Sequence, residues 1–149
     1  AKVDTNCTPP AGMDCYGVTW GAAIGMNLNQ PIDPTTMMGV VKPLPYDASA
    51  LTGFAFDISG STVPTAANFR FKVEDANGEY CTAPAKGIKL GPNVYKFTDL
   101  VSMCWAATAT SPNATVAQKG LLKISWQVVT NSSSAVPFDF CVSNIRALQ

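Results

Sequence analysis

The side chains that could do acid–base chemistry are few and scattered in this chain. It has no histidine among its 149 residues and only ten acidic residues. Without histidine there is no Ser–His–Asp or Cys–His relay. Hydrolysis of a glycosidic bond would need two carboxylates about 5–10 Å apart, one of them with a raised pKa. The carboxylates stand in ones and twos along the chain, among them Asp57, Glu74–Asp75, Glu79, Asp99 and Asp139. We expect them at solvated strand ends and turns, and we expect no enzyme.

A second set of side chains suits binding better than catalysis. A sugar needs an aromatic ring on which its C–H groups can pack and planar polar groups that bond to neighbouring hydroxyls. Trp105 follows Cys104 outside any clean alternation, so we expect a ring presented to solvent as a stacking platform. A lid over the edge of the core is the alternative. Polar residues face outward from strands predicted to share one sheet: Asp57, Arg70, Lys72, Gln127 and Asp139.

Arg70 is the best single candidate among these polar residues. It is a fork-shaped donor in the middle of a predicted strand, between Phe69 and Phe71, which should point inward. The alternative is an ordinary surface ion pair with Glu74 or Asp57. The sequence leaves both interpretations of Arg70 open.

The cysteines indicate a disulfide framework rather than a metal site. Five cysteines lie far apart, with no C-x-x-C pair and no histidine, whereas zinc sites cluster their ligands at short spacings. Disulfides place the protein outside the cytosol. We predict a Cys81–Cys104 bond, and a Cys7–Cys15 bond that ties down an N-terminal extension over residues 1–13 and leaves Cys141 spare. A Cys15–Cys141 bond is the competing pairing, and sequence cannot choose between them.

Composition narrows the possible partners and the location. The length predicts one domain, residues 1–149. Charged residues make up 13% of the chain and the formal net charge is zero, which argues against nucleic acid and anionic membranes. No apolar run approaches the roughly 18–20 residues that a bilayer crossing needs. "AKVDTNCTPPAG" lacks the core of a signal peptide. We therefore expect a secreted or extracellular protein whose export signal has been removed.

Apolar residues recur with period two, which is typical of strands with one dry face. Turn residues separate these stretches, and Asn77–Gly78 is a strong hairpin signal. We expect Ile24 and Met26 on a dry face, and we place Trp20 and Trp126 in the core. The predicted strands lie within residues 16–28, 51–60, 68–75, 94–97, 121–130 and 137–148. About eight short strands and no convincing helix predict an antiparallel β-sandwich.

Two of these strands carry unusual features. The outward side of residues 17–25 is nearly all Gly and Ala, which favours close packing with a neighbour over the floor of a shallow groove. In "PFDFCVSNIRAL", alternation stops at Val142. We expect Phe138, Phe140 and Val142 to fill the sandwich, with a bulge at Ser143–Asn144 that returns Ile145 to the core.

The order of the segments "LTGFAFDISG", "NFRFKVED", "YC", "MCW", "ISWQVV" and "PFDFCVSNIRAL" resembles that of jelly-roll carbohydrate-binding modules with a galactose-binding-like fold. The resemblance covers residues 14–148 and rests on order and spacing. It implies an all-β antiparallel sandwich of jelly-roll type, found in secreted proteins and often attached to larger enzymes.

This resemblance also implies a function. A non-catalytic module would bind a glycan or polysaccharide through a sheet face or a loop-end site, with Trp105 for stacking and Arg70, Gln127, Asp57 and Asp139 for hydrogen bonds. Similar modules often hold a structural calcium ion with an Asp near the final bulge, where this chain has Ser143 and the neutral Asn144. A structural or adhesive module that acts through protein–protein assembly is the alternative function.

Overall fold

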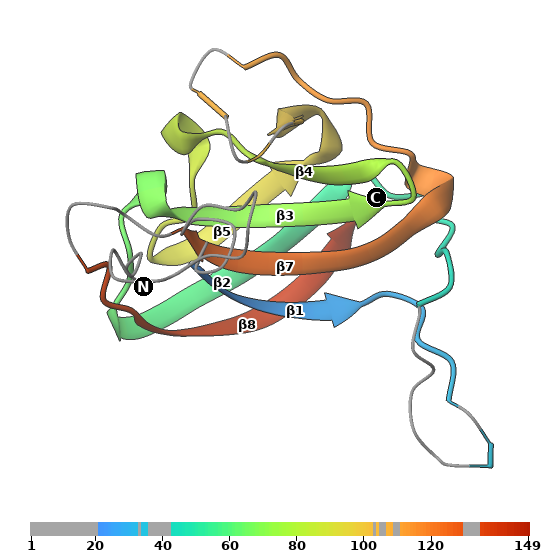
Figure 1. The fold of residues 1–149 in the computed structure, drawn as a ribbon, viewed down its shortest axis with the longest axis horizontal. Coiled ribbons are helices and arrows are strands. Elements are labelled where there is room, and N and C mark those ends of the chain that lie inside the picture. The colour runs from blue at the N-terminus through green and yellow to red at the C-terminus, as the bar shows by residue number, and fades with distance from the viewer. Residues whose placement is uncertain are drawn as a thin grey trace, which may run out of the picture.

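Eight strands form two antiparallel sheets in the computed structural model, which describes residues 21–32, 34–35, 43–102, 104, 107–108, 111–129 and 135–149 (Figure 1). The larger sheet has the order β1-β7-β3-β4-β6, and the smaller sheet has the order β5-β2-β8. The strands of the smaller sheet cross behind those of the larger one at an angle (Figure 1). The predicted fold class, an all-β antiparallel sandwich, is confirmed.

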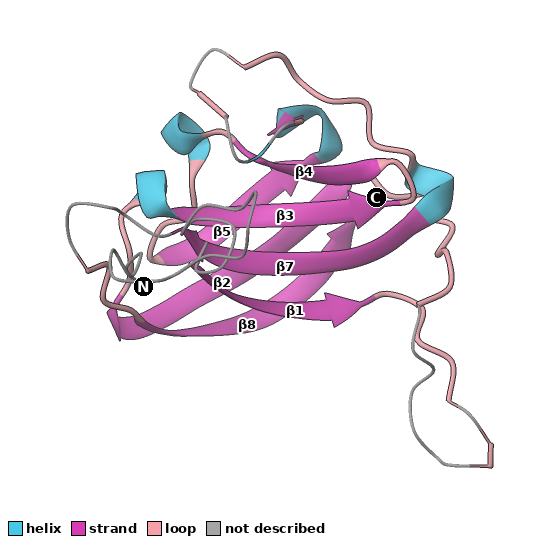
Figure 2. Cartoon of the chain, viewed as in Figure 1, coloured by secondary structure: helices cyan, strands magenta, loops and turns pink. Residues whose placement is uncertain are grey.

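The predicted strands are present with small shifts at their ends. The larger sheet consists of β1 (Gly21–Asn27), β3 (Phe69–Asp75), β4 (Gly78–Thr82), β6 (Leu100–Val101) and β7 (Leu121–Val129). The smaller sheet consists of β2 (Gly53–Thr62), β5 (Gly91–Lys96) and β8 (Asp139–Leu148). Helical structure in the described part consists of 3-10 turns (Figure 2), which include Ala66–Asn68, Pro84–Lys86, Phe97–Asp99 and Gln118–Gly120.

The core is an aromatic cluster that joins the two sheets. The ring of Phe56 on β2 lies 5.1 Å from that of Phe71 on β3 and 5.2 Å from that of Trp126 on β7. Phe71 also stacks on Tyr95 of β5 at 5.7 Å. Phe69 and Phe71 are fully buried, and Trp126 is a core residue as predicted. Alternation with period two thus placed the centre of the sandwich correctly.

The hairpin and the bulge also form, with one shift. Asp75 pairs with Gly78, so Ala76 and Asn77 make the β3–β4 turn, one residue earlier than the Asn77–Gly78 signal suggested. Asp75 holds this turn because its carboxylate accepts the N–H groups of Asn77 and Gly78.

In β8 the bulge lies one residue later than expected. Ala55 pairs with Arg146 and Asp57 with Ser143, so Asn144 and Ile145 together face Phe56. Asn144 has a φ of 50°, a left-handed conformation that Asn tolerates better than most residues. A bulge therefore explains why alternation stops near Ser143.

The predictions for the β1–β8 edge of the sandwich are wrong in part. Ile24 and Met26 pair with core residues of β7, yet they are 56% and 43% exposed. Phe138 is 44% exposed and Ile145 is 40% exposed, although both were expected in the core. The reason is the unequal width of the sheets: β1 and β8 are edge strands, and the three-stranded sheet does not cover the whole inner face of the five-stranded one. Phe140 and Val142 pack against the core as predicted.

Candidate functional site

The outer face of the larger sheet brings two predicted site residues together. Arg70 on β3 lies directly opposite Gln127 on β7, which lies opposite Ala23 on β1. The next row on this face is Gly25, Ser125, Lys72 and Cys81. Residues opposite each other in antiparallel strands have side chains on the same face. Arg70 and Gln127 therefore form a cross-strand pair, and these two residues share one sheet as predicted.

These polar side chains point away from the core, yet they are buried. Arg70, Lys72, Ser125 and Gln127 are each less than 10% exposed. Ala23, at the β1 end of the first row, is exposed and carries only a methyl group. The row is thus open toward β1 and covered toward β3.

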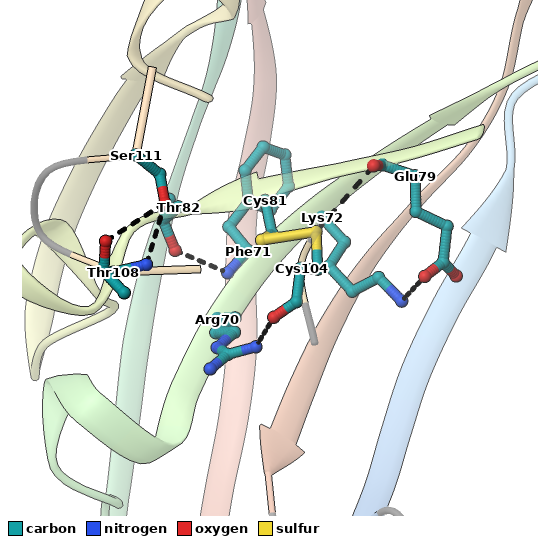
Figure 3. The surroundings of a disulfide bond; sticks show 9 residues. All are labelled: Arg70, Phe71, Lys72, Glu79, Cys81, Thr82, Cys104, Thr108 and Ser111. Atoms are coloured by element: carbon teal, nitrogen blue, oxygen red, sulfur yellow. Dashed lines mark hydrogen bonds and ion pairs between the residues drawn. A yellow bond between two sulfur atoms is a disulfide. The ribbon is translucent and has the colours of Figure 1, made fainter. Parts of the chain in front are cut away.

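A disulfide holds the cover over Arg70. Cys81 on β4 is bonded to Cys104, which confirms the predicted pair, and both cysteines are buried. The carbonyl oxygen of Cys104 accepts a hydrogen bond from Nη1 of Arg70 (Figure 3). The disulfide therefore fixes one backbone acceptor above the guanidinium group.

Arg70 differs from the two lysines on this face because no carboxylate of the described residues neutralises it. Lys72 Nζ lies 2.6 Å from Glu79 Oε2 (Figure 3), and Lys123 Nζ lies 3.8 Å from Glu74 Oε2. The described residues give Arg70 no ion pair, so a pairing with Glu74 or Asp57 is not what the structure shows. Nε of Arg70 is buried without a hydrogen-bond partner. Burial lowers the pKa of the Arg70 guanidinium, which remains a cation.

Asp57 and Asp139 do not join this pair, because they belong to the other sheet. Asp57 on β2 faces outward from the smaller sheet and accepts a hydrogen bond from Asn144 Nδ2 at 2.6 Å. Asp139 begins β8 and accepts one from Ser61 Oγ at 2.5 Å. The two sheets of a sandwich stack about 10 Å apart, and the outer faces lie farther apart still. The expectation that all the polar candidates share one sheet is therefore wrong.

A cleft of about 290 Å³ opens at the edge between β1 and β8, and Ala23 at the end of the first row is part of its lining. Its lining is mainly apolar and includes Ile24, Val128, Phe138 and Phe140, with Asp139 beside them. Alternation of apolar residues did not indicate this cleft, because it predicted Ile24 and Phe138 in the closed core. The cleft results from the unequal width of the two sheets. The alternation of apolar residues does not indicate that width.

Several predictions fall outside the described residues. Trp105, Trp20 and the N-terminal extension with Cys7 and Cys15 are among them. Cys141 is an exposed free thiol, in agreement with its prediction as the spare cysteine. At the position where the resemblance implied calcium, the amide of Asn144 is bonded to Asp57. The described residues contain no cluster of three or more acidic, His or Cys side chains that could hold a metal ion.

The shifted carboxyl pKa values bear on acid–base chemistry. Hydrogen bonds from the side chain and backbone of Ser49 lower the pKa of Asp47. Burial raises the pKa of Asp99, but hydrogen bonds from Lys86 and the Lys96 N–H outweigh it, so the net shift is also downward. A general acid requires the opposite shift.

Comparisons of the chain with protein-family models, with curated protein sequences and with solved structures each found no match. None of the helices formed by the described residues is long and apolar enough to cross a membrane.

Proposed function

We propose that this chain is a non-catalytic module that binds a glycan on the outer face of its larger sheet, over Arg70 and Gln127. The observation that carries the proposal is the cross-strand pair itself. A guanidinium and an amide are planar polar groups with fixed donor geometry, which suits neighbouring ring hydroxyls. Here they lie side by side, largely removed from water, and Nε of Arg70 still has a hydrogen to donate.

The aromatic component is assigned to Trp105. It is the residue after Cys104 in the sequence, and Cys104 is the residue whose carbonyl is bonded to Arg70. An exposed indole ring there would supply the stacking surface that a pyranose needs. Asp57 and Asp139 are left out of this site because of their positions in the smaller sheet.

Binding without turnover is supported by the state of the carboxyl groups. Those with a shifted pKa in the described part, Asp47 and Asp99, are held toward the ionised form. Since glycosidases rely on one carboxyl with a raised pKa, these two groups do not suit the role of the acid. The disulfide is compatible with an extracellular location.

The test is a glycan-array screen followed by tryptophan-fluorescence titration of any glycan that binds. We expect Gln127→Ala to weaken binding about tenfold, which corresponds to one lost hydrogen bond with a buried partner, and Trp105→Ala to abolish the fluorescence change. Gln149→Ala, at an exposed position, is the matched control and should bind like the wild type. If no plant, algal or microbial glycan binds the folded protein, the proposal is wrong.

The edge strand β1 favours a second candidate, a structural module that assembles with other proteins. Ile24 and Met26 are exposed there, and β1 carries no charge or proline, the features that usually protect edge strands. An assembling protein should sediment as an oligomer that Ile24→Lys dissociates. A monomer that binds a glycan would exclude this candidate.

A further inference from the structure

We propose that the glycan bound at Arg70 is acidic, so that a carboxylate or sulfate group on the sugar pairs with the guanidinium. This inference rests on the proposed function and names the class of its ligand. It follows from the charges on the outer face of the larger sheet and from the bonds that Arg70 does and does not make.

Among the described residues of this face, the charges do not balance. Arg70, Lys72 and Lys123 stand against Glu74 and Glu79 on the facing strands β3, β4 and β7. The two lysines take the two glutamates as partners. The remaining positive charge belongs to Arg70, which is 9% exposed. Buried charges in proteins are normally paired, so an anionic partner from the ligand would complete this site.

The geometry of Arg70 selects a group with two oxygens. Its Nη1 is used by the carbonyl oxygen of Cys104, while its Nε has no partner. The side of the guanidinium that carries Nε presents two parallel N–H groups, and these match the two oxygens of a carboxylate or a sulfate. A single hydroxyl group would occupy only one of the two.

The neighbours of Arg70 suit the rest of an acidic sugar. Gln127 lies opposite it and can bond to ring hydroxyls, and the row continues to the exposed Ala23. We expect the sugar ring to lie over this small residue at the open end of the row, with its acidic group directed into the covered end at Arg70. The edge cleft is a poorer place for an anion, because Asp139 is the one charged residue among the described residues that line it.

The experiment compares polygalacturonate with its fully methyl-esterified form, since these polymers share a backbone and differ in charge. Affinity is measured by isothermal titration calorimetry in about 0.15 M salt, which screens non-specific attraction. We expect the esterified polymer to bind at least about tenfold more weakly than the free acid, because it loses a charge-assisted pair. A sulfated galactan is the second arm, and its preference over the uronate would support the anion site with sulfate as the group.

Variants assign the effect to Arg70. Arg70→Gln should remove the preference for the acid, and Arg70→Lys should restore part of it through charge without the fork. Arg146→Gln, at an exposed arginine on β8, is the matched control and should keep the preference. Thermal unfolding shows whether each variant is folded. If Arg70→Gln does not fold, the preference for the acid is compared between Arg70→Lys and Arg146→Gln. A weaker preference in Arg70→Lys supports the proposal, and equal preferences overturn it.

The failures of the two proposals are distinguishable. Equal binding of the acid and its ester, or binding of neutral glycans only, would overturn the acidic ligand and leave the glycan-binding module intact. Binding of polyaspartate as tight as that of the uronate would show attraction of charge without recognition of a sugar, and would also overturn it. No binding of any glycan would remove the proposed function itself.

Discussion

At the scale of single residues, Asp75 holds more of the structure together than its place at a strand end suggests. It is 3% exposed, and its Oδ1 accepts hydrogen bonds from the N–H groups of Asn77 and Gly78 and from the hydroxyl of Tyr80. Its Oδ2 accepts the N–H of Ala117 at 2.8 Å. One carboxylate thus ties the β3–β4 turn to the segment before β7.

We expect Asp75→Asn to destabilise the protein by about 1–3 kcal/mol, because the amide keeps one acceptor oxygen and turns a donor toward another donor. Urea unfolding measures this loss. Asp139→Asn, at an exposed carboxylate with one hydroxyl partner, should cost less than about 0.5 kcal/mol. Equal losses in the two variants would contradict the role given to Asp75.

Tyr95 makes the stability depend on alkaline pH. Burial, with a smaller contribution from the charge of Asp99, raises its pKa to about 12, against about 10 in an unfolded chain. Because the folded state holds this proton more tightly, the contribution to stability is fully present below pH 10. It is lost as pH rises from about 10 to about 12.

We therefore expect the free energy of unfolding to fall over that range by about 2–3 kcal/mol more in the wild type than in Tyr95→Phe. The pKa of Tyr80 is also raised, mainly by burial. Tyr80 therefore changes the stability with the same sign in the wild type and in Tyr95→Phe. Tyr46→Phe, at an exposed tyrosine, is the control and should behave like the wild type. Identical pH profiles for Tyr95→Phe and the wild type would show that Tyr95 does not titrate in this way.

At the scale of elements, the disulfide connects β4 to the segment after β6 and closes a loop of moderate length. The separation between Cys81 and Cys104 is 23 residues, for which chain entropy predicts a stabilisation of about 3 kcal/mol. The bond also positions the carbonyl oxygen that Arg70 uses. Its loss should therefore affect both stability and the outer face of the larger sheet.

We expect the double variant Cys81→Ala with Cys104→Ala to lose about 3 kcal/mol and to exchange the amide hydrogens near residue 104 faster. Ala is preferred to Ser because both sites are buried. Cys141→Ser removes the exposed thiol and should leave unfolding and exchange unchanged. An unaltered melting temperature in the double variant would contradict this account.

How well the sequence predicts the burial of a residue depends on whether its strand lies in the centre or at the edge of a sheet. Phe54, Phe56 and Ile58 alternate on a central strand with a strand on both sides, so parity alone gives their burial. Ile24 has the same kind of pattern on an edge strand, where burial depends on whether the opposite sheet reaches that far. The alternation of residues along the chain does not indicate how far the two sheets overlap.

The candidate site was likewise predictable from the sequence only in part. Arg70 and Gln127 were predicted as outward residues of strands that share one sheet, and the structure places them on two neighbouring strands of the larger sheet. The hydrogen bond from Arg70 to the Cys104 carbonyl depends on a long-range tether, the Cys81–Cys104 disulfide, of which the two cysteines were the only sequence signal. Asp57 and Asp139 have the right parity but the wrong sheet, because alternation does not say which sheet a strand joins.

At the scale of the whole molecule, the aromatic cluster makes the two sheets one cooperative unit. Phe56 comes from the smaller sheet, and its ring contacts Phe71 and Trp126 of the larger sheet at 5.1 and 5.2 Å. Neither sheet can keep its inner face dry without the other. A single domain of this size is expected to unfold in one step when its core is shared in this way.

We therefore expect Phe56→Ala to lower the free energy of unfolding by about 3–5 kcal/mol and still to unfold in one transition. Near-ultraviolet circular dichroism, which reports Trp126 and Tyr95 packing, should fall at the same temperature as the far-ultraviolet signal of the strands. Val94→Ala, at an exposed valine on β5, is the control and should change stability by less than about 0.5 kcal/mol. Two separate transitions in the wild type would mean that the sheets unfold independently, and the tether of Cys104 to Arg70 would then stabilise only the larger sheet.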